Sequence, residues 1–139
     1  MNKEAIERLR NDEDYYGDFG KQYLSNSDID ALLNNPLNFK KQSQQTPAFL
    51  IGGYFHTCIL EPHKLDKYKI VKSSTRNTKL YKEIAGEDIC LLEHEADAIE
   101  LMREKVLDNE LFKDMIQDGD VEYETPGITE LEGMKWKGK

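Results

Sequence analysis

An apolar helix predicted for residues 47–60 constrains the fold of this chain more than any other segment. Thr46 offers a side-chain oxygen as N-cap, and Pro47 suits the first helical position, where its missing N–H is not needed. The apolar residues that follow lie around most of the helix circumference rather than along one stripe. Such a helix packs on several sides at once, so we expect it at the centre of the fold.

The same helix contains two adjacent glycines, with a histidine one turn later. Gly52 and Gly53 each cost about 1 kcal/mol relative to alanine in a helix, a cost that close approach of another element usually offsets. Gly52 and His56 are four residues apart and therefore share a face. A histidine in an apolar helix is more often a buried, hydrogen-bonded core residue than a ligand, and both interpretations stay open. Glu61 lies at the unfavourable end of the helix dipole, which argues against a capping or ligand role.

The region before this helix predicts a capped helix of its own. In "YLSNSDIDALLNNPLNFKK", Ser25 or Ser27 provides the N-cap oxygen, and acidic residues follow at the positive end of the helix dipole. Pro36 ends the helix because the residue before a proline avoids the α region. Residues 1–23 are polar and are predicted to form a separate N-terminal segment, with residues 24–139 in one domain.

Short strands and helices alternate after the central helix. "DKYKIVK" alternates like a strand, "TKLYKEIAG" predicts a helix closed by Gly86, and "DICLL" predicts a buried strand or the approach to a helix. The segment "EHEADAIELMREKVLDNELFKDMI" is helical, with Leu101 and Met102 at helical spacing and a break near Asp108. The last residues alternate as strands of a meander do. The sequence therefore predicts an α+β fold, with an open sheet edge around residues 120–137 through which copies of the chain associate.

Charge is distributed unevenly along the sequence. The 139 residues include 33% charged side chains and have a net charge of -8, which argues against a protein that coats nucleic acid non-specifically. From Glu83 to Glu132 there are seventeen acids against three basic residues. Residues 64–82 instead hold one acid, Asp66, and seven basic residues, namely Lys64, Lys67, Lys69, Lys72, Arg76, Lys79 and Lys82. This basic segment either attracts phosphate locally or is a solvated surface, and both interpretations stay open.

The remaining composition excludes other classes of protein. No apolar run approaches the roughly 18 residues of a transmembrane helix, and the charged N-terminus lacks the apolar core of a signal peptide. Cys58 and Cys90 lie in apolar stretches and make no metal-like pair. We therefore expect two buried free thiols in a reducing cytoplasm.

Three segments of the sequence, in this order, resemble a nuclease family. They are "LSNSDIDALLNNPLNFK", "TPAFLIGGYFHTCILEPHKLDKYKIV" and "EYETPGITELEGMKWKGK", and together they extend from Leu24 to Lys139. The order is similar to that of phage and prophage exonucleases of the exonuclease VIII (RecE-like) type, within the PD-(D/E)XK nuclease superfamily. The most specific part is the G-x-x-x-H-x-x-x-L-E-P segment around His56.

The resemblance implies a metal-dependent nuclease core in which helices flank a mixed β-sheet. It assigns His56 to the binding of a divalent metal, Mg²⁺ or Mn²⁺, and it gives Glu124, in the strand before "GMKWKG", a catalytic place in the site. The alternative for Glu124 is an exposed strand carboxylate beside Glu122. The aspartate and the Asp/Glu-x-Lys strand of the family's site are expected after Lys139. We therefore expect this chain to be the front part of an enzyme that, alone, binds metal poorly and cuts DNA negligibly.

The resemblance also implies the partners. The substrate is the end of duplex DNA, processed during phage recombination in the cytoplasm of a bacterial host, and the candidate DNA-binding residues are Lys64, Lys67, Lys69, Lys72, Arg76 and Lys79. Further copies of the chain are additional implied partners, and a single-strand annealing protein is a candidate basic partner of the acidic segment from Glu83 to Glu132. A different class of function stays open, a non-catalytic acidic interaction or inhibitor module on a nuclease-derived scaffold. A reading frame that continues past Lys139 with the two expected motifs favours the enzyme, and a stop codon there favours the module.

Overall fold

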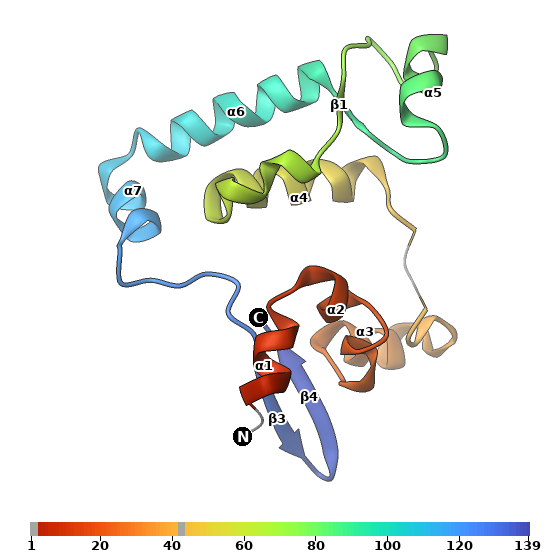
Figure 1. Cartoon of the computed structure of the whole chain (residues 1–139), viewed down its shortest axis with the longest axis vertical. Helices are drawn as coiled ribbons and strands as arrows, with labels where there is room; N and C mark the ends of the chain where they lie inside the picture. The colour runs from red at the N-terminus through yellow and green to blue at the C-terminus, as the bar shows by residue number, and fades with distance from the viewer. Residues whose placement is uncertain (1–2, 42–43) are drawn as a thin grey trace. The chain divides into compact units, whose positions relative to one another are not determined.

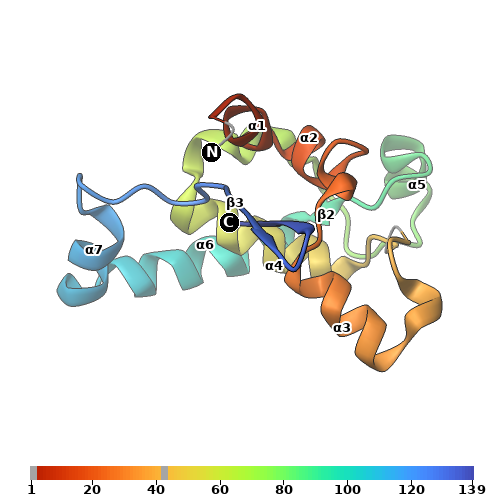
Figure 2. The ribbon, with the colours of Figure 1, turned by 90° about the horizontal axis from the view of Figure 1, so that it is seen from below.

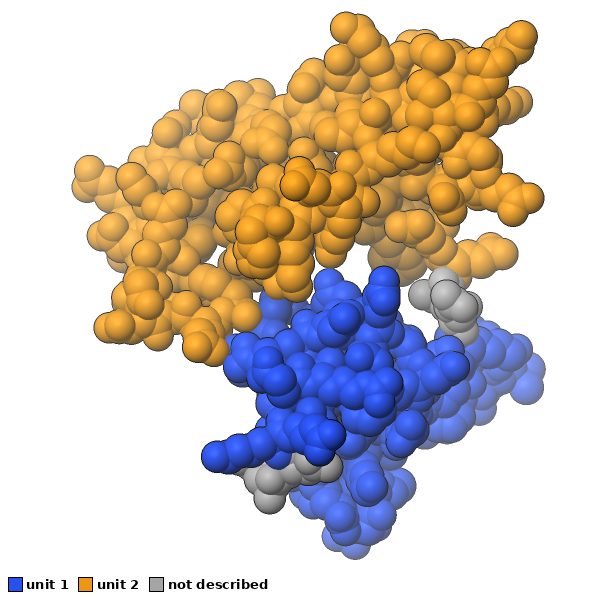
Figure 3. Space-filling model, viewed as in Figure 1, with its two compact units in different colours: residues 1–43, 124–139 blue, residues 44–123 orange. Residues whose placement is uncertain are grey.

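The computed structural model describes residues 3–41 and 44–139, which form helices and two small two-stranded sheets (Figure 1). This mixture confirms the predicted α+β class. The chain divides into two compact units (Figure 3). Residues 1–43 together with 124–139 are called unit 1 below, and residues 44–123 are called unit 2.

The central helix of unit 2, α4 (Pro47–Leu60), has the predicted bounds. Thr46 is its N-cap, and the side-chain oxygen accepts a hydrogen bond from the N–H of Phe49 at 3.2 Å. The proline in the first turn needs no such partner. The two local signals read from the sequence therefore set where this helix begins.

Helix α4 buries one face and exposes the opposite one. Leu50, Tyr54 and Cys58 are buried in a cluster shared with helix α6 (Glu93–Leu107), which runs beside α4 (Figures 1 and 2). Phe49, by contrast, is 66% exposed. The prediction of a helix packed on several sides therefore holds only for the face that meets α6 and its neighbours.

A very short parallel sheet connects two apolar clusters in unit 2. Strand β1 (Ile70–Val71) pairs in parallel with strand β2 (Leu91–Leu92). Successive side chains of a strand point to opposite faces, so Leu91 enters the cluster of α4 and α6, whereas Leu92 enters a second cluster with helix α5 (Lys79–Ala85). Strand β2 thus contributes to both clusters, and the predicted buried strand is confirmed.

Other local predictions for unit 2 are confirmed, except that one strand is shorter than predicted. Helix α5 ends at Gly86, whose φ of 63° favours glycine. The long helical segment breaks where predicted, and Asn109 caps the helix that follows, α7 (Glu110–Gln117). The strand predicted for "DKYKIVK" is shorter than expected because its first residues belong to the 3-10 helix η3 (Pro62–Lys67).

Helix α6 buries residues other than the pair picked out from its spacing. Ala96 and Ile99 are buried. Leu101 and Met102 are 57% and 53% exposed. In both ribbon views α7 lies beyond the C-terminal end of α6, at the opposite end of unit 2 from α5 (Figures 1 and 2). The helical spacing of this segment was therefore correct, but it did not show which apolar residues are buried.

Unit 1 joins the start of the chain to its last residues. Its helical elements are α1 (Lys3–Leu9), α2 (Asp12–Tyr16), η1 (Gly20–Gln22), α3 (Asn26–Asn34) and η2 (Pro36–Asn38). Ser25 caps α3 in a capping box with Asp28, as the sequence predicted. Helices α1 and α2 belong to unit 1 and bury Leu9 and Tyr15, and the separate N-terminal segment expected for residues 1–23 stays a prediction.

The last strands, β3 (Gly127–Leu131) and β4 (Met134–Gly138), form an antiparallel hairpin. Glu132 and Gly133 make its two-residue turn, and their φ angles of 52° and 73° suit a type I′ turn. The strands are shorter than predicted, since residues 121–126 are not in a strand. Pro126, which lacks an N–H, directly precedes β3 and is typical of such a boundary.

One edge of this hairpin is partly covered. The N–H of Leu24 donates to the carbonyl of Lys135, and the N–H of Lys137 donates to the carbonyl of Leu24, both at 2.8 Å. Leu24 thereby acts as a one-residue strand parallel to β4. The edge that was predicted to be open is therefore partly paired on the β4 side. Fewer unpaired backbone N–H and C=O groups remain there for association between copies.

The membrane and cysteine predictions can also be compared with the described residues. Among them, no helix combines the length and apolar character that crossing a membrane requires. Cys58 and Cys90 are both free and buried, which confirms the prediction for the two thiols. Burial, assisted by the nearby Glu100 carboxylate, raises the pKa of Cys58 to about 11, so this thiol stays protonated and unreactive.

Candidate active site

His56 lies on the exposed face of α4, opposite the buried Tyr54 and Cys58. Gly52, one turn earlier, shares this face and is also exposed. The interpretation of His56 as a buried core histidine is therefore wrong. His56 is therefore an exposed residue of unit 2.

The two glycines of α4 differ in their surroundings. A Cβ added at Gly53 would lie 3.2 Å from the hydroxyl of Tyr68, whereas one added at Gly52 would meet no described atom within 4 Å. The Tyr68 hydroxyl also lies 3.0 Å from Oγ1 of Thr57, and its ring packs edge-on against Tyr54. The predicted close approach to the glycine pair is thus made at Gly53, by a side chain, and not at Gly52.

Glu61 follows α4 and is neutralised locally. It is the C-cap residue of the helix, and its Oε1 lies 2.6 Å from Nζ of Lys64. A lysine beside a carboxylate offsets the unfavourable interaction with the negative end of the helix dipole. Glu61 is therefore part of the helix terminus.

Glu124 lies in unit 1 at a bend before β3, not in the predicted strand. Its φ of 55° is in the left-handed region, which is uncommon for a residue other than glycine. One carboxylate oxygen is 3.8 Å from Nζ of Lys139, and the same ammonium is 2.6 Å from Oδ1 of Asp12. The Lys139 side chain is only 5% exposed and lies over the rings of Tyr15 and Tyr16. The alternative of an exposed strand carboxylate is therefore wrong too.

Sequence reasoning missed the contacts that Lys137 and Lys139 make with the ring of Tyr15. The ammonium of Lys137 donates to the carbonyl of Tyr15 and lies 4.0 Å from the centre of its ring. Loss of water lowers the pKa of Lys137, and burial raises the pKa of the Tyr15 hydroxyl. Two lysines thus pack on a tyrosine from the other end of the sequence, and no local spacing signals such a contact.

The described residues do not bring together the donor set of a divalent metal. His56 belongs to unit 2 and Glu124 to unit 1. Within residues 3–41 and 44–139, no three or more His, Cys, Asp or Glu side chains form a group that could hold a metal ion. These residues by themselves do not fit a divalent cation, and the role of His56 as a metal ligand stays a prediction.

Several side chains of the basic segment bind within unit 2. Besides the pair of Lys64 with Glu61, Lys69 donates to the carbonyl of Ile84, and Nζ of Lys67 lies 5.3 Å from the centre of the Tyr68 ring. These lysines hold η3 and the strand after it against their neighbours. Their cationic groups are thus less available to phosphate than the sequence suggested.

Lys72 and Lys79 are two exposed members of the candidate set whose ion pairs are weak. Their side chains are 86% and 92% exposed, and their ion pairs with Glu93 and Glu83 are long, at 3.7 Å. Exposed ion pairs of this kind contribute about 0–1 kcal/mol and exchange readily with other anions. These two lysines are therefore the ones that can contact a phosphate backbone without breaking an internal interaction.

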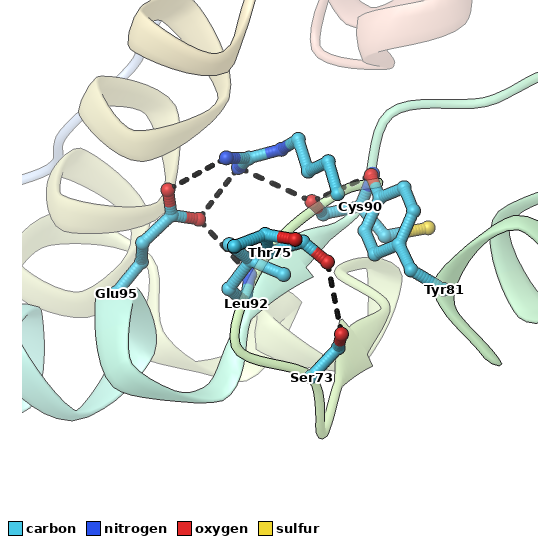
Figure 4. Close-up of polar contacts among 7 residues, drawn as sticks. Ser73, Thr75, Tyr81, Cys90, Leu92 and Glu95 are labelled. Carbon is cyan, nitrogen blue, oxygen red and sulfur yellow. Dashed lines mark hydrogen bonds and ion pairs between the residues drawn. The ribbon is translucent and has the colours of Figure 1, made fainter. Parts of the chain in front are cut away.

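Arg76 is the internal anchor of the basic segment, and its partners Glu95 and Cys90 are labelled in Figure 4. Its two Nη atoms donate to both carboxylate oxygens of Glu95 at 2.8 and 2.6 Å, and Nη2 lies 3.4 Å from the carbonyl of Cys90. Glu95 also accepts the N–H of Leu92, which caps α6. A guanidinium that makes two hydrogen bonds to one carboxylate stabilises the fold and is not available to a phosphate.

The Tyr81 hydroxyl completes this network from α5. It accepts the N–H of Cys90 at 2.7 Å and donates to the carbonyl of the same residue at 3.1 Å (Figure 4). Tyr81 is 5% exposed, so the backbone next to β2 is satisfied by one buried side chain.

We expect Tyr81→Phe to destabilise the chain by about 1 kcal/mol, because it leaves the buried backbone groups of Cys90 without this partner. Chemical unfolding of the two proteins measures the difference. Tyr123→Phe is the matched control, since its hydroxyl donates to an exposed carbonyl, that of Met115. Equal losses in both variants would contradict the role given to the buried hydroxyl.

The comparison with known families agrees with the fold class. Residues 22–139 match a family described as a PDDEXK-like domain of unknown function (DUF3799), which includes all of unit 2 and the β3–β4 hairpin of unit 1. Neither a curated protein nor a solved structure matches the chain. The match supports a nuclease-type scaffold, of a kind that generally uses divalent metals. Because it spans most of the sequence, the chain belongs to this family of PDDEXK-like domains.

Proposed function

We propose that this chain is part of a metal-dependent exonuclease that hydrolyses phosphodiester bonds at the ends of duplex DNA during phage recombination. The observation that carries the proposal is the family match across residues 22–139. The exonuclease type rests on the order of the three sequence segments and on the G-x-x-x-H-x-x-x-L-E-P motif around His56.

The exposed face of α4 supports a functional role for His56. The opposite face of the helix supplies the packing, so neither His56 nor Gly52 is needed for the core. A histidine on the exposed face of a helix whose other face is packed has a fixed backbone and an exposed ring, which suits a ligand or proton carrier. Glu124 is the weaker candidate, because Lys139 already neutralises it.

The substrate side of the proposal rests on Lys72 and Lys79. Both are exposed near the start of α5, and in the proposed enzyme they contact DNA phosphates. Lys64, Lys67 and Lys69 retain a supporting role through their internal contacts. Arg76, although first grouped with the DNA-binding residues, positions this region by holding Glu95.

Hydrolysis by this scaffold calls for more carboxylates than the described residues bring together. Hard divalent cations take several oxygen ligands, and none of the described groups provides such a set. We therefore propose that residues 1–139 alone are inactive. The family's aspartate and Asp/Glu-x-Lys strand are the groups expected to complete the site.

A nuclease assay on linear duplex DNA with Mg²⁺ or Mn²⁺ tests the proposal. We expect no degradation by residues 1–139, and degradation by a polypeptide extended about 100 residues along its reading frame, roughly one more domain. In the extended form, His56→Ala is expected to lower the rate at least about tenfold, the scale of losses at metal sites. His63→Ala, which removes an exposed histidine from η3, serves as the matched control.

Two outcomes separate the alternatives. Equal rates for His56→Ala and His63→Ala would remove His56 from the site while leaving the nuclease intact. Absence of degradation in every form would favour the second function, a non-catalytic acidic interaction or inhibitor module. That alternative is favoured by one observation, the seventeen acids between Glu83 and Glu132.

A further inference from the structure

Helix α7 presents an apolar face that takes no part in the core of unit 2. Leu111, Phe112 and Met115 lie on one side of this two-turn helix and are 66%, 51% and 64% exposed. None of the described α7 residues is buried. These three side chains are called the α7 face below. The helix is nevertheless capped by Asn109 and follows a defined break, so it is an ordered element.

Such an arrangement is unusual for a surface helix that binds nothing. Single exposed apolar residues are common, but three large ones within two turns are typical of a site that binds another molecule. Met115 and Phe112 are also the residue types favoured at the centres of interfaces, because they adapt to or fill a partner's pocket. We therefore expect another molecule to cover the α7 face.

The charge around the α7 face indicates which occupant fits. Residues 104–120 include two lysines and six acids, and all six are exposed, namely Glu104, Asp108, Glu110, Asp114, Asp118 and Asp120. One of the two lysines, Lys105, already pairs with Asp108 at 3.7 Å. An apolar face within a strongly acidic segment repels DNA and attracts a cationic surface.

We propose that the α7 face docks a basic amphipathic helix of a partner protein. Its apolar stripe covers Leu111, Phe112 and Met115, while its lysines and arginines meet the surrounding acids. This is the helix-on-apolar-face mode of recognition, in which apolar anchors supply affinity and charges supply selectivity. A second copy of this chain fits less well, because a symmetric contact would bring the two acidic segments together.

The test uses this chain and synthetic peptides of about 14 residues, roughly four helical turns. One peptide places leucines on one face and lysines on the other, and a second has the same composition in an order that gives no amphipathic helix. Fluorescence anisotropy measures binding of each labelled peptide. We expect the amphipathic peptide to bind, the scrambled peptide to bind at least about tenfold more weakly, and binding to weaken as salt is raised.

Variants assign the binding to α7. Phe112→Ser is expected to weaken the amphipathic peptide at least about tenfold, as loss of a central aromatic anchor does. Leu33→Ser removes a 78% exposed leucine from α3 and should leave binding unchanged. The double change Glu110→Gln and Asp114→Asn should flatten the salt dependence and weaken binding less than Phe112→Ser does.

Three results would overturn the proposal. Equal binding of the two peptides would show charge attraction without a helix site, and unchanged binding in Phe112→Ser would place the site elsewhere. The third is concentration-dependent dimerisation in light scattering that Phe112→Ser abolishes while no peptide binds. It would make a second copy the occupant.

Discussion

Replacing Leu91 with alanine is expected to lower the free energy of unfolding by about 2–5 kcal/mol, the range for truncating a buried leucine. Leu91 is 0% exposed and packs in one cluster with Leu50, Tyr54 and Ile99. Because it lies on β2 between α4 and α6, its truncation opens a cavity that neither helix can close alone. Urea unfolding followed by far-UV circular dichroism measures the loss, since the signal is dominated by helices.

Two further variants make this test specific. Leu101→Ala shortens a leucine on α6 that is 57% exposed, and it should change stability by no more than about 0.5 kcal/mol. Leu91→Val removes less volume, so it is expected to cost about 1 kcal/mol and gives a measurement if the alanine variant does not fold. Similar losses in Leu91→Ala and Leu101→Ala would contradict the position of β2 in the core.

Removing Arg76 has the second largest expected effect, a loss of about 2–3 kcal/mol. Arg76→Ala leaves the Glu95 carboxylate without its bidentate partner, and an unpaired carboxylate in a partly desolvated position is costly. The side chains are 24% and 15% exposed, so solvent keeps the cost below that of a fully buried pair. Lys79→Ala, three residues away and 92% exposed, should change stability by less than about 0.5 kcal/mol.

Acid should weaken the same pair. Partial burial raises the pKa of Glu95, but the hydrogen bonds from Arg76 and from the N–H of Leu92 outweigh it, and the net pKa is lowered. A carboxyl group with a lowered pKa stabilises the fold above its unfolded pKa, near 4.5, and this contribution is lost as pH falls through the folded value. Glu95→Gln should therefore lose less stability than the parent protein between neutral pH and pH of about 3. Parallel losses on acidification would contradict the ion pair's contribution.

Helix boundaries were predictable because the signals that set them are local. Thr46 and Asn109 each accept a backbone N–H three residues away, the N–H of Ser25 donates to the Asp28 carboxylate, and Gly86 supplies the positive φ at a helix end. Such bonds depend on a few neighbouring residues, so their pattern is visible in the sequence. Burial was less predictable, since a helix that is apolar on most sides does not show which face meets a neighbour.

Interactions between distant residues account for most of what the sequence did not show. Arg76 meets Glu95 across 19 residues, and Lys139 meets Asp12 across 127. The basic residues from Lys64 to Lys79 looked alike in sequence, yet only the structure distinguishes internal anchors from exposed cations. One sequence signal did concern the partner of Arg76. Glu95 stands in the first turn of a helix, where a carboxylate commonly accepts a backbone N–H and is held in place.

For the candidate site, the sequence named the residues His56 and Glu124 but did not predict their local geometry. The motif assigned His56 to a metal site, which stays a prediction, whereas the apolar helix around it favoured a buried ring and the structure shows an exposed one. Glu124 was placed in a strand because residues 121–139 alternate, but Pro126 delays the strand to Gly127. Glu124 has a left-handed φ and an ion pair with Lys139, and no alternation of apolar residues can signal either feature.

The division into a continuous unit 2 and a discontinuous unit 1 has a consequence for synthesis on the ribosome. Residues 44–123 emerge as one uninterrupted stretch, whereas α1–α3 must wait for β3 and β4, which are translated only after unit 2. At about 5–20 residues per second, the 80 residues between them take about 4–16 seconds. During this interval the backbone groups of Leu24 lack β4, and Tyr15 lacks the lysines that later cover it. The N-terminal helices are thus the part of unit 1 that is synthesised before the strands that complete it.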